Sequence, residues 1–239
     1  MRSKHYLMLW ALLIISCGPI KELGGTQNNT PSLGAIGKEH KSILNKKFEQ
    51  IGSPKIEEGI TISVLEIPFT KSEFKTYVQY KKGRGEESNL VFTDSIASKP
   101  EYLKLNISDK INLLTQLNNE NNSNVRSYLA NDGEYTIVTE ISLLANENLT
   151  DRLKKAEHVF LVEDNNGLLI LEILESNQRT IVKWSDLEIF DYGLSGFCWG
   201  KNRYGNLVIK TINGDNSGCP KGTEKKPSKL NDIKPYLKL

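Results

Sequence analysis

Residues 158–174 read HVFLVEDNNGLLILEIL, and this stretch decides the fold class of the chain. Two runs of apolar and β-branched residues, 158–163 and 168–174, flank the polar sequence DNNG at 164–167. The Asn-Gly pair supplies the positive φ angles that tight turns require. The stretch therefore predicts an antiparallel β-hairpin, and residues 179–184 extend it as a further strand.

On the N-terminal side of this hairpin, strand patterns alternate with short helical ones. The patterns predict strands at 59–67, 74–81, 101–107 and 134–144. They predict four helices. One covers 38–51, a second begins after a cap at Ser108 or Asp109, a third covers 125–129, and a fourth lies around Leu149 and Leu153. The alternation, followed by a run of strands, favours an α+β fold with a mainly antiparallel sheet and several short helices.

The first eighteen residues have the layout of an export signal. Arg2 and Lys4 precede an apolar run at 6–15, and Ser16, Cys17 and Gly18 close it. The run is shorter than the roughly 20 apolar residues that cross a bilayer. An ordinary secretory signal or a lone membrane helix is the alternative interpretation.

Residues 14–17, Ile-Ile-Ser-Cys, resemble the lipobox of bacterial lipoproteins. The resemblance implies cleavage after Ser16, acyl chains on Cys17, and the membrane as a partner through those chains. Gly18, where a retention signal for the inner membrane usually has aspartate, implies the outer membrane. The resemblance covers only the signal and implies nothing about catalysis.

The same features divide the chain into three parts. Residues 1–16 are the signal peptide, and residues 17–37 are the lipidated cysteine followed by a flexible tether rich in glycine and asparagine. Residues 38–239 are expected to form a single α+β domain that begins with the amphipathic helix at 38–51.

Charge and cysteine content narrow the function. Removing Arg2 and Lys4 with the signal peptide leaves 29 of the 31 basic side chains, equal to the 29 acidic ones. The net charge is then zero, so a nucleic-acid partner is not expected.

Apart from Cys17, the cysteines are Cys198 and Cys219. In an oxidising compartment such a pair predicts a disulfide.

Aromatic residues concentrate in the same C-terminal region. Trp184, Tyr192, Phe197, Trp199 and Tyr204 form a candidate binding patch for an envelope protein or a glycan. The alternative is structural, with these side chains packed as a small core around the disulfide.

We assign no catalytic residue, metal ligand or cofactor from the sequence, because no HExxH or CxxC spacing accompanies the few histidines. We therefore expect a lipid-anchored cell-envelope protein whose domain binds a partner or ligand. The alternatives are a membrane-anchored periplasmic hydrolase that uses carboxylates and a structural component of an envelope assembly.

Overall fold

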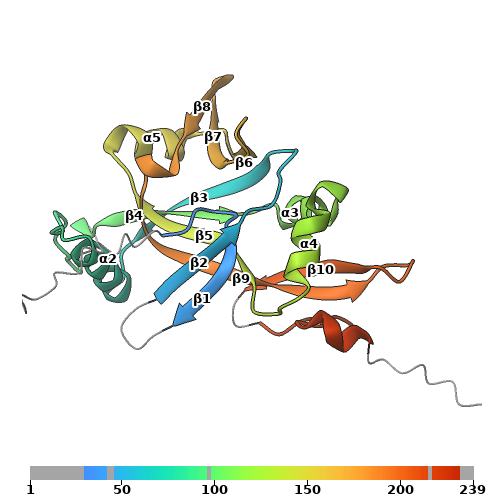
Figure 1. Cartoon of the computed structure of the whole chain (residues 1–239). Helices are drawn as coiled ribbons and strands as arrows, with labels where there is room; N and C mark the ends of the chain where they lie inside the picture. The colour runs from blue at the N-terminus through green and yellow to red at the C-terminus, as the bar shows by residue number, and fades with distance from the viewer. Residues whose placement is uncertain (1–29, 42–45, 96–97, 215–216, 232–239) are drawn as a thin grey trace, which may run out of the picture.

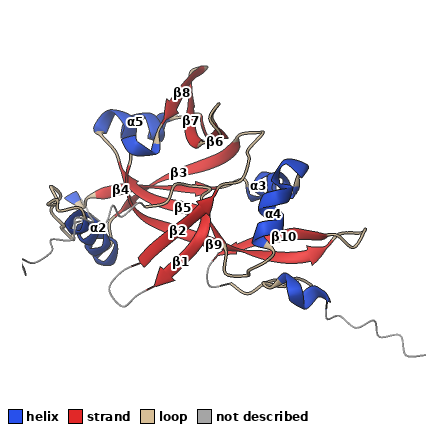
Figure 2. Cartoon of the chain, viewed as in Figure 1, coloured by secondary structure: helices blue, strands red, loops and turns tan. Residues whose placement is uncertain are grey.

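The structure is a computed structural model that describes residues 30–41, 46–95, 98–214 and 217–231. In these residues ten strands form one sheet with antiparallel pairings, and four α-helices lie around its periphery (Figures 1 and 2). This confirms the predicted α+β class. None of the described helices is long and apolar enough to cross a membrane.

The strands are β1 (Ile36–Lys41), β2 (Lys46–Gly52), β3 (Ile60–Pro68), β4 (Glu101–Ile107), β5 (Thr136–Leu144), β6 (His158–Glu163), β7 (Leu169–Glu175), β8 (Gln178–Val182), β9 (Glu188–Lys201) and β10 (Leu207–Gly214). The α-helices are α2 (Lys71–Gly83), α3 (Lys110–Asn118), α4 (Ser123–Leu129) and α5 (Glu147–Lys155), and the short 3₁₀ helices are η2 (Glu120–Asn122), η3 (Trp184–Asp186) and η4 (Pro227–Asn231).

The sheet runs in the order β10-β9-β5-β4-β3-β6-β7-β8, and β1 pairs both with β2 and with the start of β5. The predicted hairpin is β6–β7, with Glu163 opposite Leu169. The Asp164 carboxylate closes its turn, because one oxygen accepts the backbone N–H groups of Asn166 and Leu168, each at 2.8 Å. The hairpin predicted from the sequence is confirmed, but of the Asn166-Gly167 pair only Gly167 has a positive φ angle.

The predicted helix at 38–51 is wrong, because the described parts of this stretch are β1 and β2. The apolar spacing that suggested a helix has another cause: Phe48 is the buried side chain of β2, while its neighbours on that strand face solvent. The two strands approach each other closely at Gly37. A Cβ on this residue would lie 2.2 Å from the Glu49 carbonyl oxygen, so a larger residue would not fit. Tertiary pairing overrides a helical pattern here.

The predicted boundary of the tether at residue 37 is also wrong. Leu33 and Ala35 are fully buried, and Ile36 is 1% exposed. The Gly34 N–H donates to the Val138 carbonyl at 2.8 Å, and the Val138 N–H donates to the Ala35 carbonyl at 2.9 Å. The folded domain therefore includes residues 30–37, which lead directly into β1.

The predicted strand at 74–81 is wrong as well, because these residues belong to α2. Thr70 and Glu73 form a capping box at the start of this helix, with each side chain accepting the other residue's N–H. Burial by itself raises the pKa of Glu73, but hydrogen bonds from Thr70 and from the Tyr102 hydroxyl outweigh it and hold that pKa below its ordinary value. The cap thus fixes both the first turn of α2 and its position over β4.

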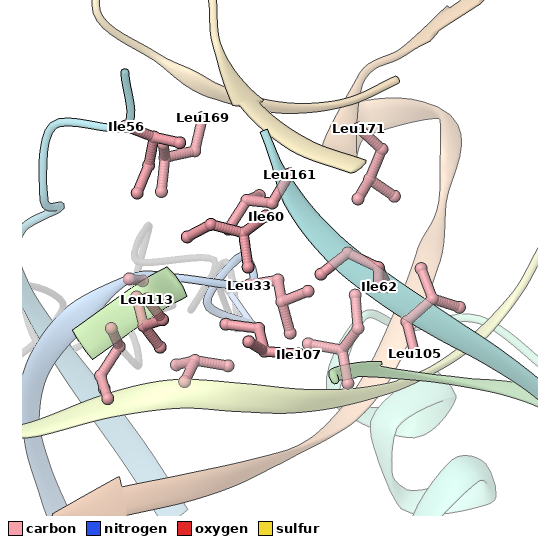
Figure 3. Packing of buried hydrophobic residues seen from close by; sticks show 14 of the residues in the cluster. Leu33, Ile56, Ile60, Ile62, Leu105, Ile107, Leu113, Leu161, Leu169 and Leu171 are labelled. Atoms are coloured by element: carbon pink, nitrogen blue, oxygen red, sulfur yellow. The ribbon is translucent and has the colours of Figure 1, made fainter. Parts of the chain in front are cut away.

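Two apolar clusters fill the fold. The larger one lies between the strands, α3 and the N-terminal segment, and Figure 3 shows Leu33 among Ile60, Ile62 and Ile107. The smaller one is aromatic and packs α2 against the sheet; its buried members are Phe69, Tyr77, Tyr80, Tyr102 and Phe190. The smaller cluster fixes α2 and β9 relative to each other, because it contains Tyr77 and Tyr80 of α2 and Phe190 of β9.

Asn122, in the asparagine-rich stretch after α3, is buried and anchors the segment between β2 and β3. The Asn122 side chain is fully buried, accepts the Lys55 N–H at 2.8 Å and donates to the carbonyls of Lys55 and Gln116, each at 2.9 Å. The Gln116 amide likewise binds the backbone of Glu57 and Glu58. These amides replace the regular backbone pairing that the segment between β2 and β3 lacks.

Candidate functional site

A cleft of about 840 Å³ lies where four segments, distant in the chain, come together. One wall is the end of α2, with Tyr80 and Arg84, and the opposite wall is the run from Trp184 to Ile189. The β5–α5 connection at 144–146 and the start of the described chain at Thr30 complete it. We call this hollow the α2–β9 cleft.

Packing of the aromatic cluster positions these walls. The Tyr77 and Phe190 ring centroids are 5.5 Å apart, which holds α2 against β9. Tyr80, Lys81 and Arg84 follow Tyr77 at helical spacings of three, four and seven residues, so they share its face of the helix. The cleft therefore stands on two rigid elements.

Lys81 joins the two walls by ion pairs. Its ammonium group lies 2.8 Å from a carboxylate oxygen of Glu188 on β9 and 2.8 Å from one of Glu86. Burial opposes the charge on Lys81, but hydrogen bonds to Glu188 and Glu86 outweigh burial and raise the pKa of the amine. Lys81 is therefore charged at neutral pH and fixes the Glu188 carboxylate at the edge of the cleft.

Arg84 and Tyr80 form the polar part of the α2 wall. The Arg84 Nε donates to Glu86 at 3.0 Å, and its Nη1 donates to the Tyr80 hydroxyl at 3.3 Å. Burial raises the pKa of Tyr80, so the phenol keeps its proton at neutral pH. A protonated phenol that accepts from Arg84 still has its own O–H to donate.

The opposite side of the cleft offers an amide, a carboxylate and an indole. The Asn146 carbonyl oxygen caps α5 by accepting the Leu149 N–H at 2.9 Å, so its amide NH₂ remains a donor. The exposed Asp186 carboxylate accepts the Lys183 N–H and the Ser185 hydroxyl, both at 3.3 Å. The half-buried Trp184 indole donates to the Leu169 carbonyl at 2.5 Å, which fixes the orientation of its ring.

A second hollow of about 330 Å³ lies between the end of β2 and α4. Its lining is mainly apolar and includes Ile36, Ile51, Val125 and Tyr128. Because it lacks the charged groups of the α2–β9 cleft, it offers less chemical selectivity.

The structure does not bring the five aromatic residues of the predicted patch onto one surface. Phe197 and Trp199 are 3% and 1% exposed and belong to the core, as the structural alternative expects. Tyr192 packs edge-on against Phe48, with ring centroids 5.8 Å apart, and Tyr204 is 71% exposed in the turn after β9. Of the five, only Trp184 lines the α2–β9 cleft.

The predicted disulfide between Cys198 and Cys219 is confirmed, with the two Cα atoms 5.5 Å apart. It ties β9 to the segment after β10. There the Glu224 N–H donates to the Trp199 carbonyl at 2.9 Å, and the Trp199 N–H donates to the Glu224 carbonyl at 2.8 Å. The bond thus closes the core over Trp199. Cys17 lies outside the described residues.

Sequence reasoning missed Tyr80, Arg84, Asn146, Asp186 and Glu188 as residues of one site. Their side chains are ordinary surface types, and the segments that carry them meet only through the fold. The one available signal was the capping pattern at Thr70 and Glu73, which indicates a helix and so places Tyr80 and Arg84 on one face.

In the described part of the chain, no group of three or more His, Cys, Asp and Glu side chains is arranged to hold a metal ion. Comparison with family models, with curated proteins and with solved structures finds no match for this chain.

Proposed function

We propose that this chain is a lipid-anchored protein of the bacterial cell envelope that binds a ligand or partner in the α2–β9 cleft. The observation that carries the proposal is the cleft itself, about 840 Å³ in volume and walled by two packed elements. Small-molecule sites typically occupy about 300–1,000 Å³ and contain a few oriented polar groups, and most of the lining of this cleft is polar. Tyr80, Arg84 and Asp186 are such groups.

The anchor is the second part of the proposal, and its support comes from the sequence around Cys17. Thr30 lines the cleft and donates its hydroxyl to the Ile189 carbonyl at 2.9 Å. Twelve residues, 18–29, separate it from Cys17. Even fully extended, the thirteen steps from Cys17 to Thr30 span at most about 47 Å. Acylation of Cys17 would therefore keep the cleft close to the lipid surface, in our proposal that of the outer membrane.

The hydrolase alternative has less support at this site. Glycoside cleavage by two carboxyl groups requires one of them in its acid form and the other ionised, in contrasting environments. Asp186 and Glu188 are the carboxylates that line the cleft, and the Lys81 ammonium group already contacts Glu188 at 2.8 Å. A fixed ammonium–carboxylate pair favours a binding role for this wall.

The anchor is tested by labelling cells that produce the full chain with radioactive palmitate. We expect label on the wild-type chain and none on Cys17→Ser, which should also keep its signal peptide. Labelling of the Cys17→Ser chain would contradict acylation at this residue.

The cleft is tested by photo-crosslinking in intact cells. The photoreactive amino acid p-benzoylphenylalanine replaces Ser185 at the cleft, or Ile181 on β8 as the control, because both side chains are exposed. We expect a crosslinked envelope component, identified by mass spectrometry, from position 185 only. Equal products from both positions, or none from position 185, would contradict binding in this cleft.

A further inference from the structure

We infer that the ligand of the α2–β9 cleft is an uncharged, polyhydroxylated molecule, namely sugar units of a neutral glycan. This inference rests on the proposed function and specifies its ligand class. It follows from the balance of charge in the cleft, the mixture of hydrogen-bonding groups and the aromatic walls.

The cationic groups beside the cleft are already matched by carboxylates. Lys81 contacts both Glu188 and Glu86, and the Arg84 Nε lies 3.0 Å from Glu86. Asp186 adds a third carboxylate to those of Glu86 and Glu188. The two cations and three carboxylates together carry one net negative charge. Sites for phosphate or carboxylate groups present uncompensated Arg or Lys side chains. This site therefore disfavours an anionic ligand.

The hydrogen-bonding groups of the cleft include both donors and an acceptor. Tyr80, Arg84 and the Asn146 amide donate, whereas the Asp186 carboxylate accepts. A sugar hydroxyl both donates and accepts, so a molecule with several hydroxyls can satisfy all of these groups together. A cationic ligand would leave the three donors unmatched, and an anionic one would lie against the unmatched Asp186 carboxylate.

Each of these groups also has a protein partner that restricts its orientation. Asn146 is held by its capping bond to Leu149, Tyr80 by the contact from Arg84, and Asp186 by the Lys183 N–H. Groups held in place lose little rotamer freedom when a ligand binds. Such a site suits a ligand of fixed ring geometry.

Aromatic surface lies among these polar groups, mainly from Trp184. The Trp184 side chain is half-buried, with its ring fixed by the bond to Leu169, whereas Tyr80 lines the cleft but is only 9% exposed. Aromatic side chains combine a large apolar face with a polar edge. Sugar rings have the same dual character, since C–H groups form their faces and hydroxyls their edges.

The experiment titrates the full mature chain in detergent with neutral hexasaccharides (maltohexaose, mannohexaose and chitohexaose) and with anionic hexagalacturonate, by calorimetry at low and high salt. We expect at least one neutral sugar to bind with a Kd that salt does not change, because screening acts only on charges. Asp186→Ala and Arg84→Ala should each weaken that binding about tenfold or more, the usual effect of losing a hydrogen bond to a charged group. Ser185→Trp, which places a bulky ring at an exposed position of the wall, should block it.

Asp151→Ala is the matched control, because this exposed carboxylate on α5 pairs with Lys155 away from the cleft. Its Kd should equal that of the wild type. Binding of hexagalacturonate alone, a Kd that rises steeply with salt, or no binding of any neutral sugar would overturn the ligand class. If position 185 still crosslinks to an envelope component in that case, the proposed function stands and only the sugar inference fails.

Discussion

Two truncated chains that differ by only the eight residues 30–37 should behave in opposite ways. A chain of residues 30–239 keeps Leu33 and Ile36, which are 0% and 1% exposed, whereas a chain of residues 38–239 loses both. Full burial of one Leu or Ile side chain contributes about 1.5–3 kcal/mol, so the pair contributes about 3–6 kcal/mol. Domains of this kind have total stabilities of about 5–15 kcal/mol.

The shorter chain also loses the start of β1, where Ile36 pairs with Ile137 on β5. The assay is thermal unfolding of both chains, exported with a cleavable signal so that the disulfide forms, and followed by circular dichroism. We expect a cooperative transition for residues 30–239. A domain of this size usually loses about 2–4 °C of melting temperature per kcal/mol of lost stability. For residues 38–239 we therefore expect a melting temperature about 6–24 °C lower, or no cooperative transition.

The point variant Leu33→Ala separates the loss of burial from the loss of chain. It should cost about 2–5 kcal/mol in the 30–239 chain, the usual range for a buried Leu truncated to Ala. Melting temperatures of the two truncated chains within about 2 °C of each other, a difference worth about 1 kcal/mol or less, would refute the assignment of residues 30–37 to the core.

Three further predictions follow from contacts described above. Reducing the Cys198–Cys219 bond, which closes a loop of 21 residues, should cost about 3 kcal/mol in the chain-entropy model. Melts with and without reductant, and of the double alanine variant, measure this, and unchanged melting would contradict it. Asn122→Ala should cost about 2–4 kcal/mol in urea unfolding, because it leaves the buried backbone groups of Lys55 without their partner; an unchanged midpoint would show that water replaces the amide. The pKa of Glu73 is lowered in the folded state, so its contribution is present above its ordinary pKa of 4.5 and lost as the pH falls below it. Stability of the wild type should therefore fall more than that of Glu73→Gln between about pH 6 and pH 3, and parallel curves would contradict this.

Local chemistry made part of the fold predictable from the sequence. The turn at 164–167 is closed by the Asp164 side chain, and Asp109, one of two candidate caps, accepts the Asn112 N–H at the start of α3. These are contacts between neighbours in the chain, so residue types and spacing suffice to predict them. The disulfide was predictable for a different reason, since Cys198 and Cys219 are the only pair that remains beside Cys17.

The errors arose where partners distant in the sequence decide the outcome. The alternation of Phe74, Thr76, Val78 and Tyr80 favours a strand, but the Thr70–Glu73 cap and the burial of Tyr77 and Tyr80 against the sheet make it a helix. For β1 the decisive partner is β5, about a hundred residues later, and β2 in turn pairs with β1. Period alone does not separate short helices from strands.

The candidate site was not predictable for the same reason. Phe197 and Trp199 are conspicuous in the sequence, but both belong to the larger apolar cluster, in a part of β9 (197–200) that is buried on both faces. The cleft is instead lined by common polar residues, such as Arg84 and Asp186, from segments about a hundred residues apart. Only the fold identifies them as neighbours.

The place of the first strand in the sheet has a consequence for how the chain folds during synthesis. Ile36 pairs with Ile137, and the Thr30 hydroxyl bonds to the Ile189 carbonyl 159 positions later. Synthesis and the proposed export both begin at the N-terminus, so the first strand emerges well before β5 and longer still before β9. Contacts between distant positions also slow the search for the native state. The segment nearest the N-terminus should thus be among the last to settle, which leaves its apolar side chains accessible to chaperones and proteases until the C-terminal half of the chain arrives.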